Sequence, residues 1–208
     1  MSAKFKKSKI TKSRSNARPG NQLGQERSRD ARDDTHNLTR HLALGERTKA
    51  IDLARSLAAN NRGCPDILES SGAVLSHFGL KKEALPILER ALSRNEHSHT
   101  LLNNLGAVYL DLGALDKAES ALKASLALTP DYVLALNNIG NLYRKKDETS
   151  LAEKFYQKAL KSEPRNSLVN INLGALYLDV RQHEKAASIF HKLWRKKKHS
   201  FDELFFMG

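Results

Sequence analysis

Hydrophobic residues repeat along this chain with a period of 34 residues. Within each period they fall at positions 4, 7, 8 and 11, and again near positions 20, 24, 27 and 28. Spacings of three and four residues are typical of the buried face of an amphipathic helix. Each period therefore predicts two antiparallel helices joined by a short turn, in an array that is helical from about residue 35 to residue 199. The expected helix pairs are 99–112 with 115–128, 133–146 with 149–162, and 167–180 with 183–197.

Small residues follow the same period. Glycine recurs at position 8 and alanine at position 20, where small side chains let the two helices of a pair approach closely. These residues are Gly72, Gly106, Gly140 and Gly174, and Ala84, Ala118, Ala152 and Ala186. Position 15 suits the residue just after a helix, and it holds Gly45, Gly79 and Gly113. Position 11 is expected to be a packing position, and it holds Tyr109, Tyr143 and Tyr177.

The second helix of each unit carries its own signals. Position 28 holds leucine in three units and Trp194 in the last. We expect the leucines to face the next unit and Trp194 to lie in the core. Pro130 and Pro164 at position 32 are expected to end second helices, because proline lacks the N–H that a helix interior requires. Pro86 lies inside an expected second helix, so we predict a kink there or a helix that begins later.

The repeated unit resembles the tetratricopeptide repeat. The resemblance rests on Leu or Ile followed by Gly at positions 7 and 8, Tyr at 11, Ala at 20 and Pro at 32. It implies an all-α fold, namely a right-handed superhelical solenoid of antiparallel helix pairs. Full units are expected at 65–98, 99–132, 133–166 and 167–200, after a degenerate unit at 31–64 and before the start of a truncated unit at 201–208. The family's tryptophan at position 4 is absent from all of these full units.

Charge is concentrated at the two ends of the chain, whose formal net charge is +12. Residues 1–30 carry nine Lys and Arg residues against two acidic ones, and "WRKKKH" occupies 194–199. We expect the arm 1–30 to be disordered. It suits an anionic partner such as nucleic acid or anionic lipid, or it serves only as a solubilising tail. No apolar run approaches the roughly 18 residues that span a bilayer. The absence of such a run and the single cysteine favour a cytoplasmic location.

The resemblance also implies where a ligand would bind. In this family the first helices line an inner groove, with positions 2, 5, 6, 9, 12 and 13 pointing into it. On that basis the predicted groove residues are Asn103, Asn104, Asn137, Asn138, Asn141, Arg144, Lys145 and Asn172.

Two interpretations of these groove residues stay open. An asparagine amide both donates and accepts hydrogen bonds, so a ladder of amides can pair with the backbone of an extended peptide. This ladder resembles the one in the repeat region of O-linked N-acetylglucosamine transferase; alternatively, the amides join neighbouring helices. Arg144 and Lys145 suit an acidic side chain or a terminal carboxylate, or they form solvated pairs with Asp111 and Asp179.

Three functions are compatible with the sequence. The first is a protein–protein interaction scaffold that binds an extended peptide. The second is the N-terminal substrate-recognition region of a larger glycosyltransferase or sulfotransferase, and the third is a nucleic-acid-associated adaptor acting through the basic arm. The sequence contains no nucleophile–base set, phosphate-binding glycine loop or carboxylate pair, so we expect no catalysis, cofactor or metal within these residues. The segment 201–208 is expected to form at most two turns of helix and to fray, because so short a helix is not stable by itself. Its apolar residues indicate either that the chain is a fragment of a longer protein or that a partner covers them.

Overall fold

The computed structural model describes residues 33–60, 64–95 and 97–205, with side chains described as far as Arg195. These residues form helices and turns without any strand. A helix over 33–43 precedes nine others. Their bounds are α2 Arg47–Ala59, α3 Pro65–His77, α4 Lys81–Leu92, α5 His99–Asp111, α6 Leu115–Leu128, α7 Val133–Lys145, α8 Thr149–Ser162, α9 Ser167–Asp179 and α10 His183–Phe205. The basic arm 1–30 lies outside the described residues.

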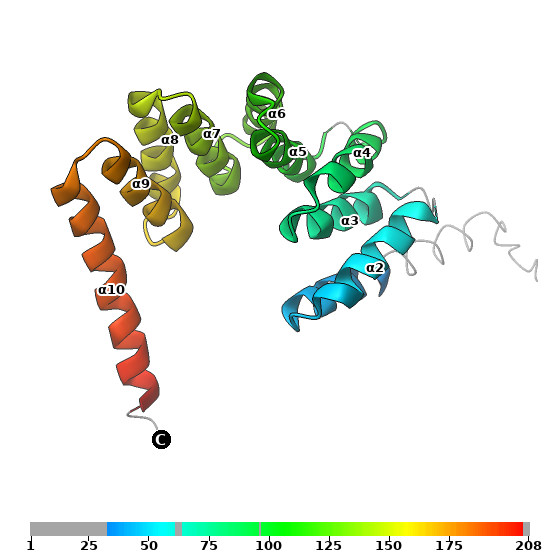
Figure 1. Ribbon diagram of the computed structural model, residues 1–208, viewed down its shortest axis with the longest axis horizontal. Helices are drawn as coiled ribbons and strands as arrows, with labels where there is room; N and C mark the ends of the chain where they lie inside the picture. The colour runs from blue at the N-terminus through cyan, green and yellow to red at the C-terminus, as the bar shows by residue number, and fades with distance from the viewer. Residues whose placement is uncertain (1–32, 61–63, 96, 206–208) are drawn as a thin grey trace, which may run out of the picture.

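Consecutive helices pack as antiparallel pairs, α3 with α4, α5 with α6, α7 with α8 and α9 with α10. The first helices α3, α5, α7 and α9 also contact one another in succession, and more extensively than their partners do. These closer contacts place the first helices along the inner curve of the array. The pairs therefore stack into an arch with α5, α6 and α7 at its crown (Figure 1). This arrangement is the solenoid that the 34-residue period predicts.

The predicted helix pairs are confirmed by the starts of α5 to α10, each of which begins at the predicted residue. The predicted end of the last helix, residue 197, is wrong, because α10 continues to Phe205 over 23 residues. The physical reason lies at position 32. Pro130 and Pro164 follow α6 and α8, whereas Lys198 occupies the same position in α10 and allows the helix to continue.

The α4 helix contains Pro86 within its span. It begins at Lys81, so the expectation of a later start is wrong. Pro86 nevertheless has no N–H to donate to the carbonyl of Lys82 four residues earlier. The interhelix contacts of Ala84 and Leu88, which are fully buried on either side of the proline, hold this helix in place.

Trp194 does not lie in the core, contrary to expectation, because its exposed fraction is 68%. Leu126 and Leu160, at the same position in earlier units, pack against the core. The difference arises because a further helix pair follows each of those leucines. No further pair within the described residues follows Trp194, and its side chain is left in solvent.

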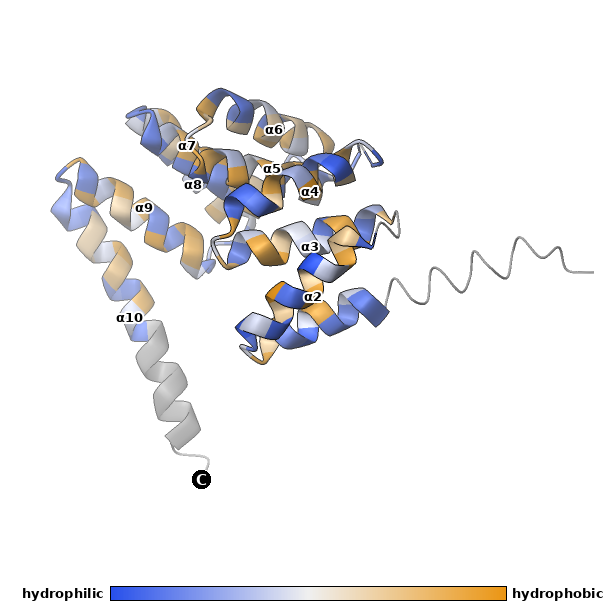
Figure 2. Ribbon diagram, turned by 45° about the vertical axis from the view of Figure 1, so that its right-hand side comes forward, coloured by the Kyte–Doolittle hydropathy of each residue, from blue (hydrophilic) through white to orange (hydrophobic). Residues whose placement is uncertain are grey.

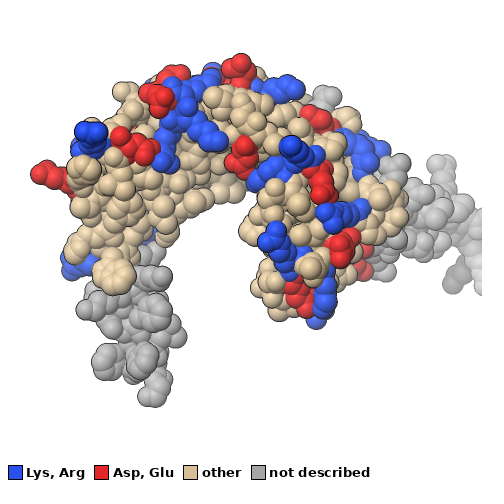
Figure 3. All heavy atoms as spheres, in the orientation of Figure 1, with Lys and Arg blue, Asp and Glu red and all other residues tan. Residues whose placement is uncertain are grey.

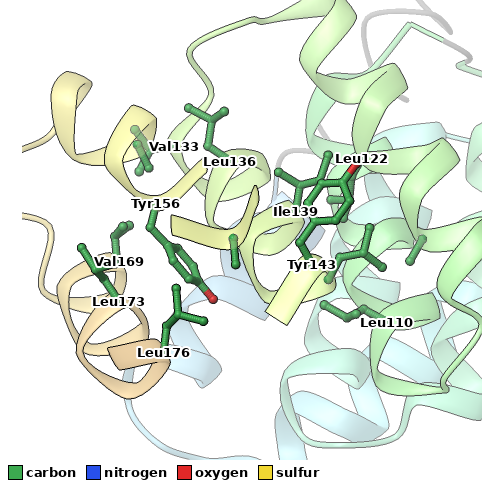
Figure 4. Packing of buried hydrophobic residues seen from close by; sticks show 14 of the residues in the cluster. Leu110, Leu122, Val133, Leu136, Ile139, Tyr143, Tyr156, Val169, Leu173 and Leu176 are labelled. Atoms are coloured by element: carbon green, nitrogen blue, oxygen red, sulfur yellow. The ribbon is translucent and has the colours of Figure 1, made fainter. Parts of the chain in front are cut away.

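The core lies between paired helices and between successive pairs, and polar residues occupy the outer helix faces (Figure 2). At its centre Tyr156 of α8 is fully buried, and Figure 4 shows its ring pointing toward Leu173 and Leu176 of α9. Position 24 supplies such a large side chain in each pair. A Cβ atom added to Gly72, Gly106, Gly140 or Gly174 would lie within 2.6 Å of an atom of Leu88, Leu122, Tyr156 or Phe190, respectively. The glycines at position 8 therefore make room for the side chains at position 24.

Position 15 ends each first helix with a left-handed residue. Gly45, Gly79 and Gly113 have φ of 68°, 84° and 78°. Asp147 and Arg181 occupy the same position with φ of 60° and 58°. The turn geometry is thus kept in the last two units although a side chain makes it less favourable. None of the described helices is both long enough and apolar enough to cross a membrane.

Candidate functional site

The asparagines of the inner helices pair across successive repeats. Asn138 of α7 donates from Nδ2 to Oδ1 of Asn103 on α5 at 2.9 Å. Asn172 of α9 donates in the same way to Asn137 on α7 at 2.8 Å. Each donor lies at position 6 and each acceptor at position 5 of the preceding unit. A ladder of amides therefore exists, and it joins neighbouring helices.

The two rows of this ladder differ in exposure. Asn103 and Asn137 are 4% and 2% exposed, so a ligand cannot reach them directly. Asn138 and Asn172 are half-buried, and the hydrogen bonds found in the described part of the chain leave their Oδ1 atoms unpaired. Asn104 is half-buried as well, and its side chain makes no hydrogen bond to a described protein group. Asn104, Asn138 and Asn172 thus form the row that is accessible from the groove.

A pocket of about 480 Å³ opens beside this row. The pocket lies where the first helices α5, α7 and α9 stack. Residues at and near position 13 of these three helices come together there. Its lining residues are Leu110, Asp111, Asn141, Arg144, Lys145, Asn172 and Asp179. Four of the eight predicted groove residues therefore share one pocket, and the buried pair Asn103 and Asn137 does not.

Each cation of the pocket is held by a neighbouring repeat. Nε of Arg144 lies 2.5 Å from Oδ2 of Asp179 on α9, and this ion pair raises the pKa of the guanidinium. Nζ of Lys145 donates to the backbone carbonyl of Leu110 on α5 at 3.0 Å. Asp111 pairs in turn with Lys81 at 2.7 Å. Both cations are thus fixed in position, and both keep N–H groups that these contacts do not use.

Asn141 is oriented by a buried tyrosine. The hydroxyl of Tyr156 donates to Oδ1 of Asn141 at 2.6 Å. Burial raises the pKa of Tyr156 to about 12, so the phenol stays protonated and keeps donating across the physiological range. With its oxygen so engaged, Asn141 presents its Nδ2 group to the pocket as a donor.

Sequence reasoning missed several features of this groove. Glu69 of α3 accepts from the hydroxyls of Thr100 at 2.5 Å and Ser98 at 3.2 Å, and so is joined to the start of α5 instead of to Asn104. Leu134 and Leu168 at position 2 are 44% and 51% exposed. Position 2 belongs to the groove by the family's pattern, so the two leucines were recognisable from the repeat register alone.

A second set of contacts joins the repeats on the far side of the inner helices. Hydroxyls of the position 11 tyrosines donate to glutamates of the preceding unit: Tyr109 to Glu89, Tyr143 to Glu119 and Tyr177 to Glu153, at 2.7, 3.0 and 2.6 Å. These tyrosines therefore link successive repeats by hydrogen bonds, in addition to their role as packing residues.

The inner face of the arch is hollowed, and cations and anions alternate over its outer surface (Figure 3). No group of three His, Cys, Asp or Glu side chains in the described ranges is placed to hold a metal ion. The pocket is lined by two cations, two carboxylates and two asparagine amides. Its chemistry is that of hydrogen-bond recognition.

Comparison with known proteins agrees with this architecture. A tetratricopeptide repeat profile matches residues 97–162, and a second profile of the same description matches residues 155–187. A sequence comparison with curated proteins gave no match.

Several solved structures have the same fold. TTC0263, a thermophilic TPR protein of Thermus thermophilus, is 21% identical with a TM-score of 0.73, over 83% of this chain and 94% of that one. MamA of Desulfovibrio magneticus RS-1 is 21% identical with a TM-score of 0.64, over 81% and 96%. Pseudomonas aeruginosa pilF is 17% identical with a TM-score of 0.67, over 80% and 76%. At such identities the likeness concerns the fold alone.

Proposed function

We propose that this tetratricopeptide-repeat protein is a protein-interaction scaffold that binds an extended peptide carrying a carboxylate along its inner groove. Residues 97–187 belong to the repeat family, whose stacked helix pairs present long concave surfaces to protein partners. The observation that carries the finer proposal is the pocket between α5, α7 and α9. There the two fixed cations and one donor amide converge.

The cations favour a carboxylate over other groups. Arg144 uses Nε for Asp179, which leaves its Nη groups for a ligand, and Lys145 uses one of its three N–H groups for Leu110. Hydrogen bonds from charged donors to a carboxylate are shorter and stronger than those between neutral groups. The two aspartates of the pocket limit its net charge, so the carboxylate is bound by directed hydrogen bonds more than by long-range attraction.

The amide row supplies the second element of recognition. Asn104, Asn138 and Asn172 stand one repeat apart and offer acceptors or donors that pair with a peptide backbone of any sequence. The buried Asn103 and Asn137 act as positioning residues, because each fixes the rotamer of the asparagine that follows it in the ladder. The amide row therefore binds the peptide backbone, and the pocket selects the carboxylate. Both lie in the same groove.

An array of synthetic peptides tests this proposal. Each sequence is presented with a free C-terminus, with an amidated one, and with or without internal acidic residues. We expect bound peptides to carry a free C-terminus or an acidic side chain. Lys145→Met, which keeps the apolar stem, should weaken their affinity on the order of tenfold or more, since a hydrogen bond to a charged group contributes about 1.5–3 kcal/mol.

Lys154→Met is the matched control, because Lys154 is an exposed lysine on the outer helix α8. It should leave affinity unchanged. Equal binding of amidated and free peptides without acidic residues, or equal effects of the two substitutions, would exclude the pocket as the carboxylate site.

A further inference from the structure

The accessible residues of α7 form one stripe whose chemistry changes along the helix. Between residues 133 and 143 only Leu134, Asn138 and Asn141 are not buried, and the exposed Lys145 follows them. Spacings of four, three and four residues place these four side chains within about 60° of one another around the helix axis. The stripe is therefore apolar at the N-terminal end of α7, amide in its middle and cationic at its C-terminal end.

Leu168 of α9 extends the apolar end of this stripe to the next helix. Leu134 and Leu168 are 44% and 51% exposed. Stacking joins residues 35 apart, as in the hydrogen bond between Asn137 and Asn172. The same register puts Leu168 across from Val133 and therefore next to Leu134. We call Leu134 and Leu168 the leucine pair.

The preceding helices do not continue the leucine pair. Thr100 occupies the equivalent position of α5, and its hydroxyl donates to Glu69 of α3 at 2.5 Å. Asp66 occupies that position of α3. Among α3, α5, α7 and α9, apolar surface at this position is thus confined to α7 and α9. The same two helices carry Asn138 and Asn172 of the amide row, and α7 carries both cations of the pocket.

The amide row runs between the leucine pair and the pocket. At a rise of 1.5 Å per residue, Asn138 is about 6 Å from Leu134 and about 10 Å from Lys145 along the axis of α7. An extended peptide that pairs with the amide row turns one edge of its backbone toward the floor of the groove. Its successive side chains then point to opposite sides of the row. Side chains on one side reach the leucine pair, and those on the other side reach the pocket.

We propose that the leucine pair is an apolar subsite, which binds one large apolar side chain of a peptide whose acidic side chain occupies the pocket. This subsite serves the peptide of the proposed function, and so the proposal rests on that function. Because alternate side chains face opposite sides, the apolar residue stands at an odd distance from the acidic one. A strand rises about 3.3 Å per residue and packed helices are about 8–10 Å apart, so the distance is one or three residues.

A peptide library tests this spacing. Its members are amidated, carry one fixed glutamate and are randomised around it, and they are selected on the immobilised 208-residue chain. We expect leucine, isoleucine, methionine or phenylalanine to be enriched one or three positions from the glutamate, and not two positions from it. A library without glutamate should not be retained.

A double variant assigns the enrichment to its residues. Leu134→Ala combined with Leu168→Ala should abolish the apolar preference and keep the requirement for glutamate. Both leucines are exposed, so the melting temperature should stay that of the wild type. Leu128→Ala is the matched control, because Leu128 is 44% exposed at the end of the outer helix α6, and it should keep the apolar preference.

Two defined peptides give the magnitude. Amidated peptides of serine and alanine carry one glutamate and one leucine, either three or two positions apart, and fluorescence anisotropy measures their affinity. The spacing of three should bind on the order of tenfold more tightly, since each buried methylene group is worth roughly fourfold. The double variant should remove this ratio, whereas Lys145→Met should weaken both peptides and preserve it.

The outcomes separate this subsite from the carboxylate pocket. Equal affinity for the two spacings, no retention of the amidated library, or an apolar preference that survives in the double variant would overturn the subsite. A glutamate requirement without any apolar preference would overturn it as well and leave the proposed function standing. Equal retention of libraries with and without glutamate would instead contradict the proposed function.

Discussion

Gly140 of α7 lies directly against the ring of Tyr156 on α8. A Cβ atom at residue 140 would come within 2.6 Å of Cε1 of that ring, closer than real side-chain contacts allow. The ring cannot move aside easily, because it is fully buried and its hydroxyl is hydrogen-bonded to Asn141. This contact fixes the separation of α7 and α8.

Gly140→Ala should therefore destabilise the protein by about 1–3 kcal/mol, the usual effect of overpacking a core. Helix propensity acts in the opposite direction and favours alanine by about 1 kcal/mol, so a net loss identifies the clash as dominant. Urea denaturation measures the change in the free energy of unfolding. In a Tyr156→Ala background the same substitution should cost less or become stabilising. An equal cost in both backgrounds would exclude the ring as the cause.

Ser71→Ala should raise stability by about 1 kcal/mol, since the change removes a buried hydroxyl that has no partner. Ser71 is fully buried at position 7, and its Oγ has no hydrogen-bond partner. Ser125→Ala is the matched comparison. Ser125 is equally buried, but its hydroxyl donates to the carbonyl of His99 at 2.7 Å, so its loss should be destabilising. Thermal denaturation of the two variants should give shifts of opposite sign.

Asn172→Ala should lower the free energy of unfolding by about 1–3 kcal/mol, because the buried Oδ1 of Asn137 would lose its donor. Asn138→Ala should do the same through Asn103. Asn104→Ala, which removes no such bond, should be nearly neutral in urea titrations. Equal stability of all three variants would show that the amide pairs contribute nothing to the stacking of repeats.

Acid should weaken the junction between α6 and α7 through Glu119. Hydrogen bonds from Lys123 and Lys146 lower the pKa of this carboxylate from 4.5 to about 2. Because the folded pKa is the lower one, the stabilisation is complete above pH 4.5 and disappears as the pH falls toward 2. Glu119→Gln should therefore reduce the melting temperature at about pH 6 and lose this effect by about pH 2. Melting curves that stay the same distance apart across this range would contradict the shift.

Much of the candidate site was visible in the repeat register. The spacing placed Asn138, Asn141, Lys145 and Asn172 on the inner helices, and the structure puts Asn141, Lys145 and Asn172 in one pocket. The sequence could not distinguish the two rows of asparagines. Adjacent positions 5 and 6 carry the same residue, and only the stacking of successive helices makes Asn137 buried and Asn138 half-buried.

The sequence by itself determined the helix pairs and their starts, because apolar periodicity, prolines and glycines act within one repeat and need no distant partner. Tertiary structure decided everything that depends on a neighbouring repeat. Trp194 has the apolar character of a core residue, and it lies in solvent because burial requires a helix pair beyond it. Arg144 and Asp179 are 35 residues apart, and they meet because stacking brings position 12 of one repeat against position 13 of the next.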